Sequence, residues 1–188
     1  MRNFAHLDDE ECARLAQNGE NRAFSVLVTR YQDRIYRFLL RLTRAPEDAQ
    51  DLTQDTFLRA HQALGRWRPE APFRSWLFKI ARNSAFDQLR RSKLIEFVTL
   101  EDDVDVADPR AGLDTQMETA QRFRQIELAL QALPAAHREI LLLREMEQMS
   151  YDEITVILDI PAGTVKSRLA RARAALLDMI QHQSESPR

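Results

Sequence analysis

The sequence contains a single cysteine, Cys12, so neither an internal disulfide nor a cysteine-based zinc site can form within the chain. It contains no run of eighteen apolar residues, which argues against a membrane-spanning helix. Its first twelve residues are too acidic and polar for a signal peptide. We therefore expect a cytoplasmic protein, in which Cys12 is an incidental small side chain rather than the alternative, a redox sensor.

Strand-like alternation of apolar and polar residues is also missing over any useful length, whereas apolar residues recur at spacings of three and four. Hydrophobic residues make up 44% of the 188, enough for a core in one domain or in each of two small ones. The pattern predicts an all-α fold. The expected helices cover residues 8–17, about 23–43, 46–64, 73–93, 114–133, 134–149, 150–158 and 164–176.

The net charge of −2 hides an uneven distribution along the chain. Residues 1–93 hold 17 basic and 12 acidic residues, residues 94–117 hold 1 and 7, and residues 118–188 hold 9 and 10. This division predicts a basic helical domain (1–93), an acidic linker (94–117) and a nearly neutral helical domain (118–188) whose cations gather in one helix.

The segment Ser150–Leu176 has the pattern of a helix-turn-helix. Ser150 and Glu153 form a predicted capping box at the start of the first helix. Asp159, Pro161 and Gly163 then interrupt the helical pattern over a length that suits a tight turn. In the second helix, apolar residues keep to one face while cations and hydroxyls occupy the other, as reading a DNA major groove requires. The alternative is a solvated amphipathic helix pair, which the combination of cap, breaker and two apolar stripes disfavours.

The predicted helix 46–64 carries Asp48, Asp51 and Asp55 on one face. Three carboxylates could hold a metal ion, but no histidine or other ligand accompanies them at matching spacing. A protein-docking surface is the better interpretation, and we expect neither a metal nor a cofactor.

Residues 66–93 interleave aromatic and basic side chains, which suits single-stranded nucleic acid because cations follow phosphates and rings receive unstacked bases. The alternative is that Trp67, Phe73, Trp76 and Phe78 are core residues, and for Trp76 and Phe78 we expect the core.

Four motifs in one order resemble the extracytoplasmic-function (ECF) class of bacterial RNA polymerase sigma factors, of the sigma-70 family. They are AF-x2-L-x3-Y (23–31), DAQDLTQDTFLRA (48–60), FRSWLFKIARNSAFDQLRR (73–91) and LP-x3-REILLLRE…SYDEI…IPAGTVKSRLARAR (133–173). The resemblance implies a sigma region 2 domain, an acidic linker and a sigma region 4 domain. The chain departs from the family at Asp159, where glycine is usual; Asp tolerates left-handed geometry, so we expect the turn to survive.

The resemblance also implies binding residues for core polymerase, through the clamp coiled coil of its largest subunit and the flap region, and for promoter DNA. For the clamp these are Asp51, Leu52, Gln54, Asp55 and Phe57. For the minus-10 element, which region 2 opens by capturing a flipped base, they are Arg66, Trp67, Lys79, Arg82, Asn83 and Arg90. For the minus-35 duplex they are Thr164, Lys166, Ser167, Arg168, Arg171 and Arg173.

Two further expectations come from the resemblance. An anti-sigma factor would hold the free protein inactive. In many family members the anti-sigma factor is anchored in the membrane, and such an anchor would keep this protein at the inner membrane face. The acidic linker, with Asp102, Asp103 and Asp105, would lie in the basic template and RNA-exit path of polymerase as a nucleic-acid mimic; a merely soluble spacer is the alternative.

Two other classes of function compete with the sigma factor. An autonomous helix-turn-helix regulator explains residues 150–176 but leaves the acidic and the aromatic-basic helices without a role. An enzyme would need a nucleophile–base pair, a metal cluster or a phosphate loop, and His6, His61, His137 and His182 occur in no such setting. We therefore expect a non-enzymatic protein.

Overall fold

The computed structural model describes residues 4–96 and 114–185, and no strand occurs among them. This confirms the all-α prediction. Three short helical turns, Phe4–His6, Leu64–Arg66 and Leu142–Met146, accompany the α-helices. The α-helices are α1 Asp9–Gln17, α2 Asn21–Thr43, α3 Pro46–Ala63, α4 Phe73–Glu96, α5 Asp114–Ala132, α6 Ala135–Leu141, α7 Tyr151–Leu158 and α8 Ala162–Glu185.

Helix α4 continues to Glu96, three residues beyond the predicted end of the first domain, and α5 begins at Asp114. The intervening residues 97–113 include Asp102, Asp103 and Asp105. The predicted role of the linker therefore lies outside the described residues.

The N-terminal bundle, α1–α4, begins and ends its helices where the sequence signals lie. Asp8 caps α1 in a full capping box with Glu11, α2 ends at the left-handed residue Arg44, and Pro46 opens α3. The apolar stripe of α2 is buried and meets α4, where the rings of Phe38 and Phe78 pack edge to face at 5.3 Å.

The C-terminal bundle, α5–α8, contains the predicted helix-turn-helix. Ser150 and Glu153 form both hydrogen bonds of the capping box at the start of α7. Asp159 ends α7 in the left-handed conformation, with φ 56°, as expected of the residue that stands where the family usually has glycine. Val165 and Leu169 of α8 are buried against this core.

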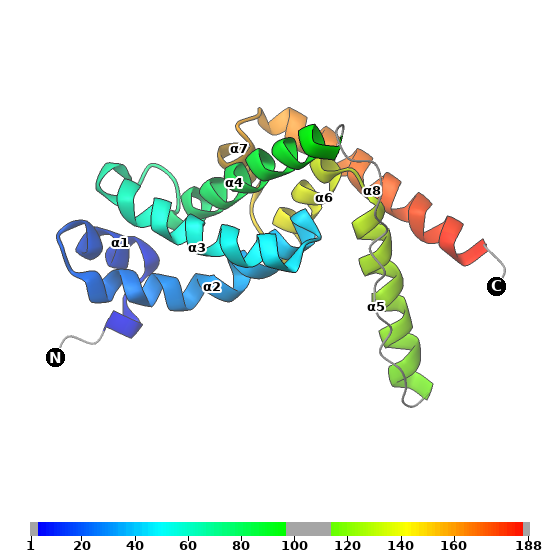
Figure 1. Cartoon of the computed structure of the whole chain (residues 1–188), viewed down its shortest axis with the longest axis horizontal. Helices are drawn as coiled ribbons and strands as arrows, with labels where there is room; N and C mark the ends of the chain where they lie inside the picture. Colours follow the sequence, from blue (N-terminus) through cyan, green and yellow to red (C-terminus); the bar gives the residue numbers. More distant parts are fainter. Residues whose placement is uncertain (1–3, 97–113, 186–188) are drawn as a thin grey trace.

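The apolar residues whose spacing indicates a helix here do not form one buried face. Leu130 and Leu133 are buried, but Phe123 is 57% exposed and Ile126 is 44% exposed. Only the C-terminal part of α5 packs on the bundle, while its N-terminal part projects away from the body (Figure 1), so these two side chains have no neighbouring helix to cover them.

The two bundles pack against each other, which the sequence did not predict. Helix α7 lies on α4, and α6 lies against α2 (Figure 1). The buried Arg138 of α6 donates hydrogen bonds to the carbonyl oxygens of Leu42 (2.9 Å) and Arg41 (3.2 Å) at the end of α2 and of Leu133 (2.7 Å). It thereby satisfies carbonyls that the helix end leaves free. Burial, together with the nearby Arg44, lowers the pKa of Arg138 to about 10.

Replacing Phe38 by alanine should destabilise the N-terminal bundle by about 3–5 kcal/mol, because it leaves a cavity against Phe78. Both tryptophans of the sequence, Trp67 and Trp76, belong to this bundle, so urea unfolding followed by tryptophan fluorescence reports on it selectively. The control is Leu58→Ala on the exposed face of α3, with an expected change of about 0.5 kcal/mol or less. Equal effects of the two changes would contradict this packing.

Candidate functional site

The acidic face of α3 is open to solvent over much of its length. Asp51 and Gln54 are exposed, Asp55 and Phe57 are half-buried, and Leu52 is buried in the core of the bundle. Asp55 forms an ion pair of 2.7 Å with Arg59 one turn later, which contributes little because both groups are in contact with water. The exposed carboxylates and amide are thus available to a partner, whereas Leu52 serves mainly to hold the helix.

No group of three potential metal-binding side chains occurs within residues 4–96 and 114–185. The described helices include none that is both long and apolar enough to cross a membrane. Cys12 is buried, and burial raises the pKa of its thiol, which disfavours the reactive thiolate. Its surroundings agree with the interpretation of Cys12 as a small core residue.

The predicted minus-10 residues do not all share one surface. Arg66, Asn83 and Arg90 are exposed and Lys79 is half-buried. Trp67, expected to contact DNA, is only 3% exposed. Its ring packs edge to face on Phe73 at 5.9 Å, so here it is a core residue.

Side chains of α1 hydrogen-bond the backbone at both ends of the loop that joins α3 to α4. Gln17 donates hydrogen bonds of 2.8 Å to the carbonyl oxygens of both Leu64 and Trp67. Glu10 accepts a 3.0 Å hydrogen bond from the backbone N–H of Phe73, where α4 starts. The loop Gly65–Pro72 is therefore fixed at both ends, as a specific binding loop requires.

Arg82 of α4 is engaged by the C-terminal bundle. Its guanidinium lies over the ring of Phe86 at 4.3 Å and donates to Glu139 of α6 at 2.8 Å. The side chain of Glu139 is only 1% exposed. Burial raises the pKa of Glu139, and the hydrogen bond and charge of Arg82, with the charge of Arg168, oppose that shift.

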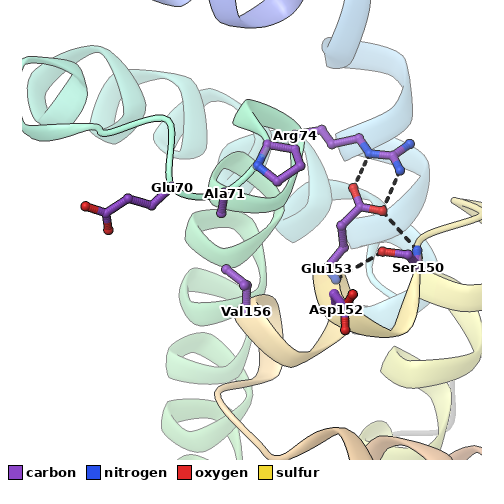
Figure 2. A pocket seen from close by; sticks show the side chains of 8 residues that line it. Glu70, Ala71, Arg74, Ser150, Asp152, Glu153 and Val156 are labelled. Atoms are coloured by element: carbon purple, nitrogen blue, oxygen red, sulfur yellow. Dashed lines mark hydrogen bonds and ion pairs between the residues drawn. The ribbon is translucent and has the colours of Figure 1, made fainter.

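A second pair joins the start of α4 to the start of α7 (Figure 2). Arg74 forms a two-pronged ion pair with Glu153, through its Nε and through its Nη2, which lies 2.6 Å from Oε2. Ser75 also donates to Glu153, at 3.2 Å. Burial alone would raise the pKa of Glu153, but hydrogen bonds from Arg74 and Ser150 outweigh it and bring the pKa to about 2. Glu153 thus serves both the capping box and the contact between the bundles.

Beside this pair lies a pocket of about 350 Å³ between the loop before α4 and the first helix of the helix-turn-helix. Figure 2 shows Val156 and Asp152 of α7 on one side and Glu70 and Ala71 on the other. The loop before α4 and the start of α7 therefore face each other across this pocket.

Helix α8 carries the predicted minus-35 residues. Val165, Leu169 and Ala172 fix its buried side. Arg173 forms an exposed ion pair of 2.6 Å with Glu145. Of the predicted residues, Lys166, Ser167, Arg171 and Arg173 are exposed, and Thr164 and Arg168 are half-buried. The helix is held by one face and presents most of the predicted residues on the other.

Sequence reasoning missed Arg74 and the glutamates that bind the arginines of the N-terminal bundle. Glu153 was identified as a capping residue, but nothing in the local sequence links it to Arg74, which lies 79 residues earlier. Glu139 lies beside the apolar run Ile140–Leu143, and no local pattern in the sequence indicates that it pairs with an arginine of the other bundle.

Comparisons with known families and proteins agree with this geometry. Residues 27–95 match Sigma-70 region 2, and residues 123–176 match Sigma-70, region 4. The RNA polymerase sigma-H factor of Pseudomonas aeruginosa is 34% identical over 92% of this chain and 94% of its own length. The ECF RNA polymerase sigma factor SigM of Mycobacterium tuberculosis is 37% identical over 86% of this chain and 79% of its own.

Two solved structures share the fold over most of the chain. CnrH in complex with the cytosolic domain of CnrY has a TM-score of 0.69 at 28% identity, and the match covers 95% of this chain and 99% of that one. The sigma factor RpoE in complex with the anti-sigma factor NepR, from Bartonella quintana, has a TM-score of 0.67 at 26% identity, covering 84% and 96%.

Replacing Glu153 by glutamine should lower the free energy of unfolding at neutral pH by about 2 kcal/mol, because it removes charge-assisted hydrogen bonds. The folded-state pKa, about 2, lies below the ordinary 4.5. The contribution is therefore complete above pH 4.5 and is lost as the pH falls from 4.5 toward 2.

Urea unfolding of both proteins across this pH range measures the effect. The difference in stability should shrink steadily below pH 4.5. Glu145→Gln, at an exposed ion pair, is the control and should cost about 1 kcal/mol or less. A wild-type advantage over Glu153→Gln that does not change with pH would contradict the assignment.

Proposed function

Because the chain belongs to the ECF sigma factors of the sigma-70 family, we propose that it directs core RNA polymerase to specific promoters and opens their minus-10 element. The observation that carries this proposal is the joint presence of a solvent-open acidic helix, α3, and an outward-facing basic helix, α8, in one chain that matches both sigma regions. Docking on polymerase and reading DNA are then separate tasks of separate helices.

Helix α3 is the proposed contact with the clamp coiled coil of the polymerase largest subunit. Asp51 and Gln54 are exposed, and Asp55 and Phe57 are half-buried beside them. Leu52, buried, supports this surface from within. A mixed surface of charge, amide and aromatic ring suits a specific protein contact because charges steer the encounter and the ring supplies buried area.

Helix α4 and the preceding loop are the proposed minus-10 surface. Asn83 can hydrogen-bond a base edge, while Arg66, Lys79, Arg82 and Arg90 supply positive charge for phosphates. Strand opening requires no covalent chemistry: unstacking a base costs a few kcal/mol, and a fitted pocket with phosphate contacts offsets that cost. The burial of Trp67 assigns it to the support of the loop rather than to stacking.

Helix α8 is the proposed minus-35 reader, through its N-terminal residues in the major groove. Thr164, Lys166, Ser167 and Arg168 are the candidates for base-edge or adjacent phosphate contacts. Arg171 and Arg173, further along the helix, are the candidates for phosphate contacts. The flap region of polymerase is the proposed second docking point for the C-terminal bundle.

An anti-sigma factor is the proposed regulator of the free chain. This rests on the relative RpoE, whose structure was solved in complex with the anti-sigma factor NepR. Anchoring of such a partner in the membrane, which would hold the cytoplasmic chain at the inner membrane face, is a further part of this proposal.

A gel-shift experiment with and without core polymerase tests the function against that of an autonomous regulator. A sigma factor should retain promoter fragments only when core polymerase is present. Tight sequence-specific binding by the isolated chain would instead support the regulator.

Reversing the charge of Asp51 should weaken binding to core polymerase about tenfold, since a specific exposed contact is replaced by repulsion. Asp51→Lys can be compared with Glu20→Lys, the same reversal type at an exposed position at the start of α2. Binding is measured by titrating labelled chain with core polymerase. Equal affinities of the two variants would exclude α3 as the docking helix.

Replacing Arg168 by alanine should reduce minus-35-dependent initiation about 5- to 150-fold, the equivalent of about 1–3 kcal/mol for one base contact. Binding to core polymerase should stay unchanged because Arg168 is assigned to DNA and not to the clamp or flap contacts with polymerase. Transcription in vitro with core polymerase gives the first quantity and titration the second, with Arg22→Ala as a control at an exposed arginine of α2. Loss of polymerase binding by Arg168→Ala would refute this division of labour.

A further inference from the structure

Within the part of the chain that the structure describes, four arginines of the N-terminal bundle each pair with a glutamate of the C-terminal bundle. Two of the pairs, Arg82–Glu139 and Arg74–Glu153, join α4 to α6 and α7. The other two join α2 to the C-terminal bundle, Arg34 to Glu147 at 2.8 Å and Arg41 to Glu127 at 2.8 Å.

The carboxylates of the α4 pairs are more deeply buried than their partners. The side chains of Glu139 and Glu153 are 1% and 8% exposed, whereas those of Arg82 and Arg74 remain partly open to solvent. A buried carboxylate without a cation is strongly destabilising, so the closed arrangement of the bundles depends on these arginines. If the bundles separated, the glutamates and the arginines would both be exposed to water, and the glutamates would no longer need the arginines beside them.

The same guanidinium groups are suited to phosphate. The planar fork of an arginine binds the two oxygens of a carboxylate and those of a phosphate with the same geometry. Arg74 uses both prongs on Glu153, and Arg82 directs Nε and Nη2 at Glu139. Arg82 is one of the proposed minus-10 residues, and Arg74 lies at the start of the same helix.

We propose that the C-terminal bundle is an intramolecular competitor of the minus-10 strand, in which Glu139 and Glu153 hold the two arginines that bind DNA phosphates after the bundles separate. Arg74 is thereby assigned as a further DNA-contacting residue. The inference rests on the proposed minus-10 function of α4. In the closed chain, α7 also faces the loop before α4 across a pocket of about 350 Å³ (Figure 2).

The competition has a measurable consequence in the free protein. The apparent affinity for single-stranded DNA is the intrinsic affinity multiplied by the fraction of open molecules. If about one molecule in ten is open, removing the competitor tightens binding about tenfold. The double variant Glu139→Gln/Glu153→Gln removes both charges and keeps the shape of both side chains.

Two measurements on the full chain test the proposal. Small-angle scattering gives the radius of gyration, and fluorescence anisotropy gives the affinity for a labelled single-stranded oligonucleotide of mixed sequence. The control is Glu20→Gln/Asp178→Asn, which changes the net charge equally at two exposed acids. The double variant should expand and bind about tenfold more tightly than this control. Adding Arg82→Gln or Arg74→Gln to it should reverse most of the gain.

Expansion without tighter DNA binding than the control overturns the proposal, and so does an unchanged radius with unchanged affinity. Circular dichroism checks that the variant is folded; should it lose helix, Glu153→Gln alone gives the same comparison with a smaller expected change. Failure of the proposed function can be distinguished from failure of this inference. If the chain is not a sigma factor, no promoter complexes form with core polymerase, but the double variant still expands and binds single-stranded DNA more tightly.

Discussion

The arrangement of this chain depends on carboxylates of the C-terminal bundle that are buried against arginines of the N-terminal bundle. Glu139 is the clearest case, since its side chain is 1% exposed and burial raises its pKa although Arg82 and Arg168 act in the opposite direction. Such a group is tolerable only with a cation beside it. The partner comes from α4, so the two bundles that each have their own core are also held to each other.

This constraint connects the surfaces proposed for DNA. Arg82, from the proposed minus-10 helix, and Arg168, from the proposed minus-35 helix, both act on the same carboxylate. The acidic face of α3 takes no part in these pairs and stays open. A chain built in this way can offer the proposed docking helix to polymerase while the arginines proposed to bind DNA are still engaged, so that docking can precede promoter recognition.

The helices could be predicted from sequence because their signals are local. The capping boxes at Asp8 and Ser150, the proline that opens α3 and the spacing of apolar residues along α2 all act within a few residues. The pairing of the bundles could not be predicted, because it joins side chains 57 to 113 residues apart whose charges look like solvated surface in the sequence. The burial of Trp67 and the exposure of Phe123 could not be predicted for the same reason, since periodicity or composition cannot say whether a neighbouring helix covers a side chain.

Promoter specificity is the property that this chain is proposed to give core polymerase. It can be measured by transcription reconstituted from core polymerase, the purified chain and a library of genomic fragments, with the start sites mapped by sequencing. We expect starts that require the chain and that lie downstream of two shared elements at a fixed spacing, one for each bundle. Starts that are independent of the chain, or that share only one element, would refute this function.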